Sequence, residues 1–218
     1  MAAQNLAETT PDGAALLRNE PVQARSTARL AGLLDAAAAI IDEIGYERLT
    51  TAMVADRAGA SIGTVYRYFP DRIVVLQSLS SRFLQTFVER ANAAVRDPAH
   101  ANWQDAIAAV IDMVVDTFRS ETGYRSLRLG DVLDIRPAAS AHPGGAVVAE
   151  TIAAGLVERF DLPAEDLAFR VEVAIDIADA LLARAFANER AGDERFIAEA
   201  KAIVHDYLAA AYGEPVKG

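Results

Sequence analysis

The segment that most constrains the fold of this chain is residues 50–72, TTAMVADRAGASIGTVYRYFPDR. Thr50 can begin a short helix, because its hydroxyl can accept a hydrogen bond from a free backbone amide of the first turn. Gly59 stands where that helix would end in the left-handed conformation, which glycine adopts at little cost. Ser61 can begin a second helix in the same way, and Pro70 helps to end it. Two short helices around a glycine turn predict a helix-turn-helix.

The second of these helices has one apolar face and one polar face. Val65 and Phe69 are spaced i, i+4, and we expect them to pack against the first helix. The polar face carries hydroxyl groups and one guanidinium, on Ser61, Thr64, Tyr66, Arg67 and Tyr68. Gly63 allows the backbone to approach another surface closely. Such a face either meets water in an ordinary helical hairpin or contacts DNA.

The charges of the chain are unevenly distributed. Its formal net charge of −10 argues against a general nucleic-acid binder, which is usually basic. Residues 23–72 are nevertheless neutral, because the bases Arg25, Arg29, Arg48, Arg57, Arg67 and Arg72 match the acids Asp35, Asp42, Glu43, Glu47, Asp56 and Asp71. A neutral segment can bind DNA if its bases cluster on one face. Its phosphate contacts should then be few and salt-dependent, which favours a dimer.

The composition excludes several classes of protein. With 52% hydrophobic and 24% charged residues, the chain is globular rather than disordered. It contains no cysteine, so neither disulfides nor thiolate metal sites are possible. Its start lacks the pattern of a secretory signal, and no apolar run approaches the ~20 residues that span a bilayer. We expect a soluble protein of the cytoplasm.

The sequence offers little support for an enzyme. His100, His142 and His205 are scattered, without a second ligand at helical spacing, so no metal site is predicted. No cofactor is predicted either, because no glycine-rich phosphate loop follows a strand. Asp131 and Asp134 form an i, i+3 carboxylate pair, but such pairs on surface helices are usually solvated.

Most of the chain outside this segment is predicted to be helical. Residues 1–22 lack sustained periodicity and are predicted to form a disordered tail. Ser26 or Thr27 would begin the first helix, which Gly45 ends. Further helices are expected at about residues 73–96, 102–120, 124–135, 146–160, 164–191 and 194–212, with a loop at 136–145. No stretch alternates as a strand does, so the predicted fold class is all-α.

The predicted helix at residues 164–191 is apolar on two sides. One seam repeats at alternating spacings of four and three and consists of Leu167, Val171, Ala174, Ala178, Leu181 and Ala185. A flank adds Val173, Ile177, Ala180 and Leu182. One side is expected to meet its own domain and the other a dimer partner, although burial as a central helix is the alternative. The predicted dimer interface includes Val148, Ile152, Val171, Ala174, Ala178 and Leu181.

Residues 29–76 resemble the DNA-binding domain of TetR-type transcriptional regulators. The resemblance rests on an alanine-rich first helix and on the motifs Gly45-Tyr46, Leu49-Thr50-Thr51, Val54-Ala55, Ala58-Gly59-Ala60-Ser61, Gly63-Thr64 and Tyr66-Arg67-Tyr68-Phe69, with a base at Arg72. Members of this family are all-helical homodimers whose variable C-terminal domain binds a small molecule and forms the dimer interface. The resemblance implies a helix-turn-helix domain at residues 23–72 and a ligand-binding and dimerisation domain at residues 73–218.

The resemblance also assigns roles to individual residues. The family's phosphate contacts match Thr51, Tyr66 and Arg72. Its major-groove surface matches Gly63, Thr64, Arg67 and Tyr68. With the cap residues Thr50 and Ser61, these form the predicted DNA-binding set. Ala52 and Ile62 occupy places that are polar or basic in many members, so base recognition would rest mainly on Thr64, Arg67 and Tyr68.

A ligand cavity in the C-terminal domain is likewise implied by the resemblance. Such a cavity is generally apolar, with a few polar groups. Suitable lining residues are Phe83, Phe87, Trp103, Met113, Phe118, Tyr124, Leu127 and Phe186. The alternative is that most of these side chains belong to the hydrophobic core.

The residues and the resemblance together predict a ligand-responsive, DNA-binding transcriptional regulator. It would be a homodimeric repressor that a small molecule releases from a pseudo-palindromic, double-stranded operator. The alternative is a helical ligand-binding or dimerising protein whose head no longer reads DNA. Ala52, Ile62 and the acidic net charge favour that alternative.

Overall fold

The computed structural model describes residues 13–127 and 144–213. They form the helices α1 (Gly13–Ile44), α2 (Thr51–Arg57), α3 (Ile62–Tyr68), α4 (Arg72–Arg96), α5 (Trp103–Ser120), α6 (Gly144–Phe160), α7 (Leu167–Ala185) and α8 (Glu194–Tyr212), and the 3₁₀ helices η1 (Tyr46–Arg48) and η2 (Tyr124–Ser126). These described residues contain no strand, which confirms the all-α fold class. None of their helices is long and apolar enough to cross a membrane.

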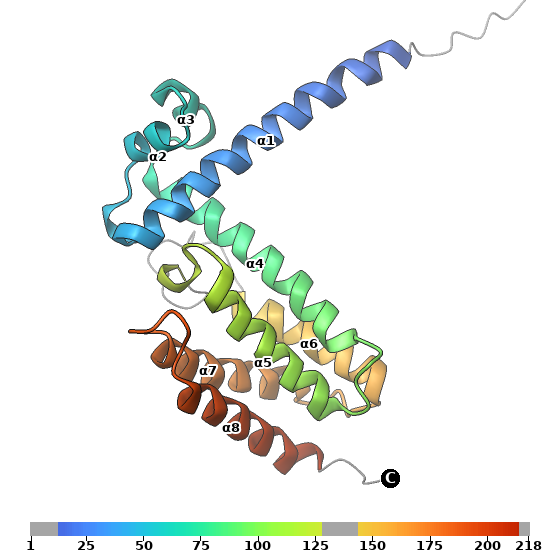
Figure 1. Cartoon of the computed structure of the whole chain (residues 1–218). Helices are drawn as coiled ribbons and strands as arrows, with labels where there is room; N and C mark the ends of the chain where they lie inside the picture. Colours follow the sequence, from blue (N-terminus) through green and yellow to red (C-terminus); the bar gives the residue numbers. More distant parts are fainter. Residues whose placement is uncertain (1–12, 128–143, 214–218) are drawn as a thin grey trace, which may run out of the picture.

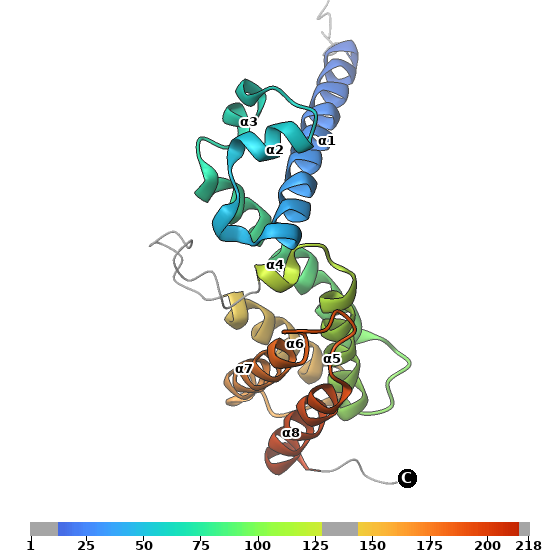
Figure 2. The same ribbon diagram turned by 60° about the vertical axis from the view of Figure 1, so that its left-hand side comes forward.

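The first three helices form a head, and η2 with α5 to α8 forms a body. Helix α4 extends from the head into the body (Figure 1). In the head, α2 and α3 pack on each other beside α1 (Figure 2). Leu34, Ile41, Val54, Val65 and Phe69 are each at most 5% exposed, which confirms the small core that their spacing predicts. This core continues through α4 into the core of the body.

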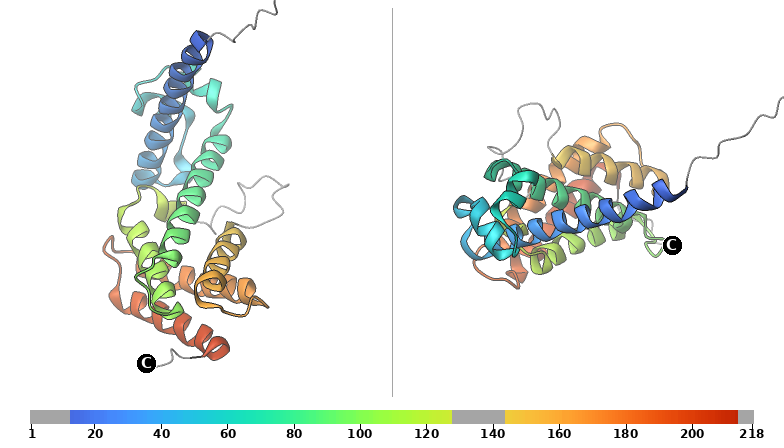
Figure 3. Two further views of the ribbon diagram at one scale, coloured as in Figure 1. Left: turned by 90° about the vertical axis from the view of Figure 1, so that its right-hand side faces the viewer. Right: turned by 90° about the horizontal axis from the view of Figure 1, so that it is seen from above.

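Helix α1 begins earlier than predicted. It starts at Gly13 rather than near Ser26, so the prediction of a tail is wrong for residues 13–22. Residues 14–18, AALLR, are strong helix formers, and a helix that already exists is extended at little cost. As a result α1 projects beyond α2 and α3 (Figures 1 and 3).

Two predicted elements of the body differ from the structure. The helix expected at residues 124–135 is represented by η2 alone, because residues 128–143 lie outside the described residues. The carboxylate pair at 131 and 134, the loop at 136–143 and His142 lie there too. Helix α7 is shorter than predicted because the chain turns back after Ala185. Gly192 permits this turn, since its φ is 85° and a Cβ there would lie 2.7 Å from the ring of Phe186.

Contacts from three parts of the chain join α1 of the head to the rest of the protein. On α4, Arg82 Nη1 donates a hydrogen bond to Asp35 Oδ1 at 2.7 Å. After α7, Arg190 Nη1 lies 3.8 Å from Asp42 Oδ2. At η2, the amide of Gly123 donates to Asp42 Oδ1 of α1 at 3.3 Å. A Cβ on Gly123 would lie 2.8 Å from the carbonyl oxygen of Ala38, so η2 approaches α1 closely. Both α4 and η2 are therefore in direct contact with the head.

Candidate nucleic-acid interface and ligand cavity

The helix-turn-helix has the geometry that its cap residues predict. Thr50 Oγ1 accepts from the amide of Met53 at 3.2 Å, and Ser61 Oγ accepts from the amide of Thr64 at 3.1 Å. Gly59 adopts a φ of 58° between the two helices. Each cap satisfies an amide that has no partner within its own helix. These local contacts fix where α2 and α3 begin.

Helix α3 presents its polar face outward. Val65 is fully buried and Phe69 is 1% exposed, as their spacing predicts. None of the predicted DNA contacts is buried, and Tyr66 is 53% exposed. Tyr68 is half-buried instead, and its hydroxyl lies 3.2 Å from Ser26 Oγ of α1. The two tyrosines thus separate into one exposed ring and one ring held against α1.

A basic groove lies between α1 and α3. It is lined by Arg25, Ser26, Ala28, Arg29, Gly32, Leu33, Ala58, Arg67 and Tyr68. The guanidinium of Arg67 lies 5.2 Å from the centre of the Tyr68 ring. The hydrogen bond with Ser26 lowers the pKa of the Tyr68 hydroxyl, and the charges of Arg67 and Arg29 act in the same direction. Three arginines converge here with no acidic residue in the lining, so the groove suits a phosphate.

Several acidic residues of the head are paired elsewhere. Arg57 donates two hydrogen bonds to the carboxylate of Glu43, at 2.6 and 2.7 Å, and this contact holds the pKa of Glu43 below its usual value. Asp35 pairs with Arg82 of α4 at 2.7 Å. The head is neutral overall, but its basic groove is separate from these ion pairs.

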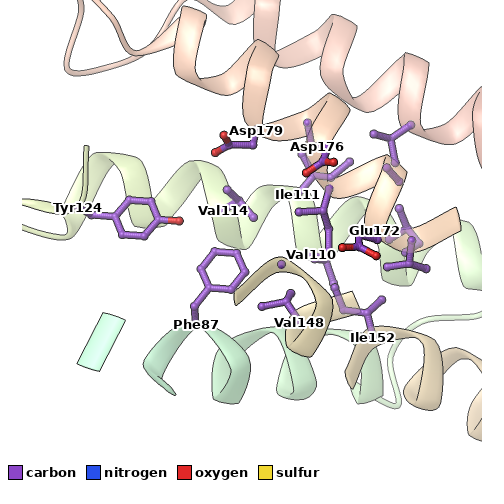
Figure 4. Close-up of a pocket in the computed structure, with 17 residues that line it drawn as sticks. Phe87, Val110, Ile111, Val114, Tyr124, Val148, Ile152, Glu172, Asp176 and Asp179 are labelled. Carbon is purple, nitrogen blue, oxygen red and sulfur yellow. The ribbon is translucent and has the colours of Figure 1, made fainter. Parts of the chain in front are cut away.

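The body encloses an apolar cavity of about 270 Å³ (Figure 4). Its walls come from α4, α5, α6 and α7, with Tyr124 of η2 and Val204 of α8. The aliphatic lining residues are Ile107, Val110, Ile111, Val114, Val148, Ile152, Val171, Ala174, Ile175, Ala178 and Val204. Their elements are distant in the sequence, and tertiary packing alone brings them together.

Only two of the predicted ligand-binding residues line this cavity, namely Phe87 and Tyr124. Phe83 and Phe118 pack edge-on against the ring of Tyr124, with distances of 5.8 and 5.3 Å between ring centres. Phe186 stacks on Phe118 at 4.8 Å. Trp103 lies in a separate hollow beside His205, and Met113 and Leu127 are buried core residues outside the cavity lining.

The predicted dimer seam faces inward. Val148, Ile152, Val171 and Ala174 are at most 5% exposed within one protomer, so assigning them to a dimer interface was wrong. Together with Ala178 they line the cavity. Leu181 packs against the hydrophobic core. Helical periodicity identifies residues that share a face, but it does not show whether that face meets the protomer's own interior or a partner.

The cavity also has an acidic edge that the sequence prediction missed. Glu172, Asp176 and Asp179 of α7 belong to its lining. Figure 4 shows the three carboxylates along the α7 side of the cavity. Their spacing, i, i+4 and i+7, was a usable signal, because it places three acids on one face of a largely apolar helix whose two bases, Arg170 and Arg184, stand near its ends.

Comparison with known proteins identifies the architecture. The family described as "Bacterial regulatory proteins, tetR family" matches residues 33–77. The family described as "Tetracyclin repressor-like, C-terminal domain" matches residues 101–212, more than half of the 218 residues. This chain belongs to the TetR family. The resemblance of residues 29–76 to TetR-type regulators is thereby confirmed.

Solved structures of transcriptional regulators share the fold. A TetR-family transcriptional regulator from Streptomyces coelicolor is 30% identical, with a TM-score of 0.69 over 84% of this chain and 98% of that chain. FadR from Bacillus subtilis, solved in complex with stearoyl-CoA, is 19% identical, with a TM-score of 0.65 over 85% of this chain and 99% of that chain.

Curated relatives match the chain only in part. The HTH-type transcriptional repressor KstR of Mycobacterium tuberculosis is 46% identical over 50 residues, which are 23% of this chain and 23% of that protein. The chain spans less than half the length of the curated relatives that it matches, with 41% for the nucleoid occlusion factor SlmA of Haemophilus influenzae.

Proposed function

We propose that this protein is a ligand-responsive transcriptional repressor of the cytoplasm that a small molecule releases from a pseudo-palindromic operator. One observation carries the proposal: an exposed α3 and a ligand-sized cavity share one continuous core. We assign DNA binding to residues 23–72 and ligand binding with dimerisation to residues 73–218. The family membership supports a regulator rather than an enzyme.

In the proposed DNA complex, α3 enters the major groove. Thr64 and Arg67 would then contact base edges, where arginine can form two hydrogen bonds with guanine. Thr51, Tyr66 and Arg72 would contact phosphates and set the register of the head. The basic groove at Arg25 and Arg29 would hold a further phosphate, so α1 would extend the contact beyond the helix-turn-helix.

We further propose a homodimer formed by the outward side of α7. Phe169 is 64% exposed, and Val173 and Ile177 continue the same side of the helix at spacings of four. Phe169→Glu should shift the protein to a monomer in light scattering after gel filtration. Ile62→Glu, in which a glutamate replaces another exposed apolar side chain, should remain dimeric. A dimeric Phe169→Glu variant would contradict this interface.

The proposed release mechanism uses the contacts that α4 and η2 make with α1. Phe87 of α4 and Tyr124 of η2 both line the cavity, and these two elements contact the head. A ligand that moves either ring would change the separation of the two heads in the dimer. The ligand must favour that state by a coupling of ~1–3 kcal/mol.

Selection of bound fragments from genomic DNA, followed by affinity measurements at graded salt, tests the proposed function. We expect an inverted repeat with half-sites about 34 Å apart or a multiple of it. Affinity should fall steeply with salt, since phosphate contacts release counterions. A protein that prefers no sequence over random duplex at low salt would be the alternative helical protein, whose head does not read DNA.

A further inference from the structure

If the cavity is the effector site, as the proposed function requires, its polarity selects the class of effector. The described lining combines aliphatic walls and two aromatic rings with charge of a single sign. Glu172, Asp176 and Asp179 contribute three carboxylates, of which Asp179 already interacts with another group, and no lysine, arginine or histidine lies among the described lining residues. The cavity is an apolar space with an acidic edge.

The carboxylates stand together on one side of this space. In Figure 4 they project from α7, while Phe87 of α4 lies on the opposite side of the cavity. Within one protomer Asp176 is exposed, and Glu172 and Asp179 are half-buried. Among the described residues, neither Glu172 nor Asp176 has an ion-pair or hydrogen-bond partner.

This arrangement discriminates between charges. An anionic head group would meet like charges beside walls that screen the repulsion less than water does. A neutral apolar molecule would bury surface against the walls but gain nothing from the carboxylates. A cation with an apolar body gains from both, and aromatic faces attract alkylammonium groups in addition.

We propose that the cavity binds a cationic amphiphile, with its ammonium group at Glu172 and Asp176 and its apolar body between α5 and α6. The volume of about 270 Å³ restricts the apolar body to a short chain or a single ring system. Phe87 and Tyr124 then contact the ligand directly, so the same molecule reaches both elements that touch the head.

Titration calorimetry with three probes of equal chain length tests this assignment. Octyltrimethylammonium should bind at least about tenfold more tightly than octanoate, with 1-octanol between them. Added sodium chloride should weaken binding of the ammonium probe and leave binding of 1-octanol unchanged.

A variant without the two carboxylates tests whether they cause the preference for the ammonium probe. Glu172→Gln combined with Asp176→Asn should bind the ammonium probe no more tightly than 1-octanol. Continued binding of 1-octanol by this variant shows that the cavity is intact. Glu150→Gln removes an exposed carboxylate of α6 outside the cavity lining and should leave the preference unchanged.

Three results would overturn the assignment: octanoate binding as tightly as the ammonium probe, a preference that survives in the double variant, or no binding of any probe. The DNA selection separates this outcome from failure of the proposed function. Sequence-specific DNA binding without a cation preference would support the proposed regulator and contradict the cationic effector. Cation binding without sequence-specific DNA binding would support the cavity site and contradict the regulator.

Discussion

The two candidate binding surfaces of this protein carry opposite charges. The groove between α1 and α3 contains Arg25, Arg29 and Arg67 and no acidic residue in its described lining. The cavity of the body contains three carboxylates and no base in its described lining. The net charge of −10 does not show this difference, because it is the sum over a neutral head and an acidic remainder of the chain. Charge at each site, rather than total charge, therefore indicates what the site binds.

The division also orients the protein on DNA. An acidic body is repelled by the phosphate backbone, so the head is the part that approaches the duplex. The same body attracts small cations to the edge of its cavity. DNA and the proposed effector are thus directed to different ends of the molecule, and α4 and η2 connect those ends.

The largest effect is expected when the reading face itself is changed. Arg67→Ala should weaken binding of the preferred DNA by ~1–3 kcal/mol per head and relax the base preference. Arg72→Ala should weaken all sequences alike, since a phosphate contact carries no base information. Fluorescence anisotropy with selected and random duplexes measures both. Equal loss of base preference in the two variants would contradict this division of roles.

A smaller effect is expected in the basic groove. Arg25→Ala combined with Arg29→Ala should reduce the magnitude of the slope of log affinity against log salt by about 1, since the groove would hold one phosphate and each phosphate contact contributes about 0.9. The control is Arg57→Ala, because that guanidinium already pairs with Glu43. It should leave the slope nearly unchanged. An unchanged slope in the double variant would show that α1 does not touch DNA.

The head could be predicted from sequence because its signals are local. The caps at Thr50 and Ser61 and the turn at Gly59 depend on neighbours within four residues, and each is confirmed. The beginning of α1 is harder to predict, because residues near Gly13 favour a helix by propensity but lack an apolar stripe that would mark one.

The body was less predictable because its cavity is assembled from distant elements. The spacing of Val171 and Ala174 correctly indicated a buried face of α7, but it did not show that this face packs inside the protomer rather than against a dimer partner. Large aromatic side chains were favoured as cavity lining, whereas Phe118 and Phe186 fill space around Tyr124. Which apolar residues border a void depends on side-chain packing among several helices, which periodicity does not encode.

Coupling between the two regions can be broken at η2. Gly123 has a φ of 80° and lies against Ala38, whereas Gly59 has a φ of 58° with open space around it. Gly59→Ala should cost about 1–2 kcal/mol of unfolding free energy from backbone strain alone. Gly123→Ala should cost about 1–3 kcal/mol more through overlap with α1, and it should weaken ligand release of DNA. Urea unfolding compares the two, and equal costs would contradict a tight η2–α1 contact.

The smallest effect concerns two tyrosines. The hydrogen bond with Ser26 lowers the pKa of Tyr68 in the head, whereas burial raises the pKa of Tyr212 in the body. Between the lowered pKa of folded Tyr68 and the higher pKa of an unfolded tyrosine, the free energy of unfolding should rise with pH. Between the pKa of an unfolded tyrosine and the raised pKa of folded Tyr212, it should fall with pH. Carbon NMR of ring-labelled tyrosines, assigned with Tyr68→Phe and Tyr212→Phe, measures both titrations. Ser26→Ala should raise the pKa of Tyr68 and leave that of Tyr212 unchanged.

The central claim is that occupation of the acidic cavity weakens DNA binding by the basic head. The most direct measurement is the dissociation constant for the selected operator, at constant ionic strength, with and without saturating octyltrimethylammonium. A coupling of ~1–3 kcal/mol predicts that the ammonium probe raises this constant about 5- to 150-fold, while octanoate leaves it unchanged. The same dissociation constant with and without the bound ammonium probe would contradict the claim.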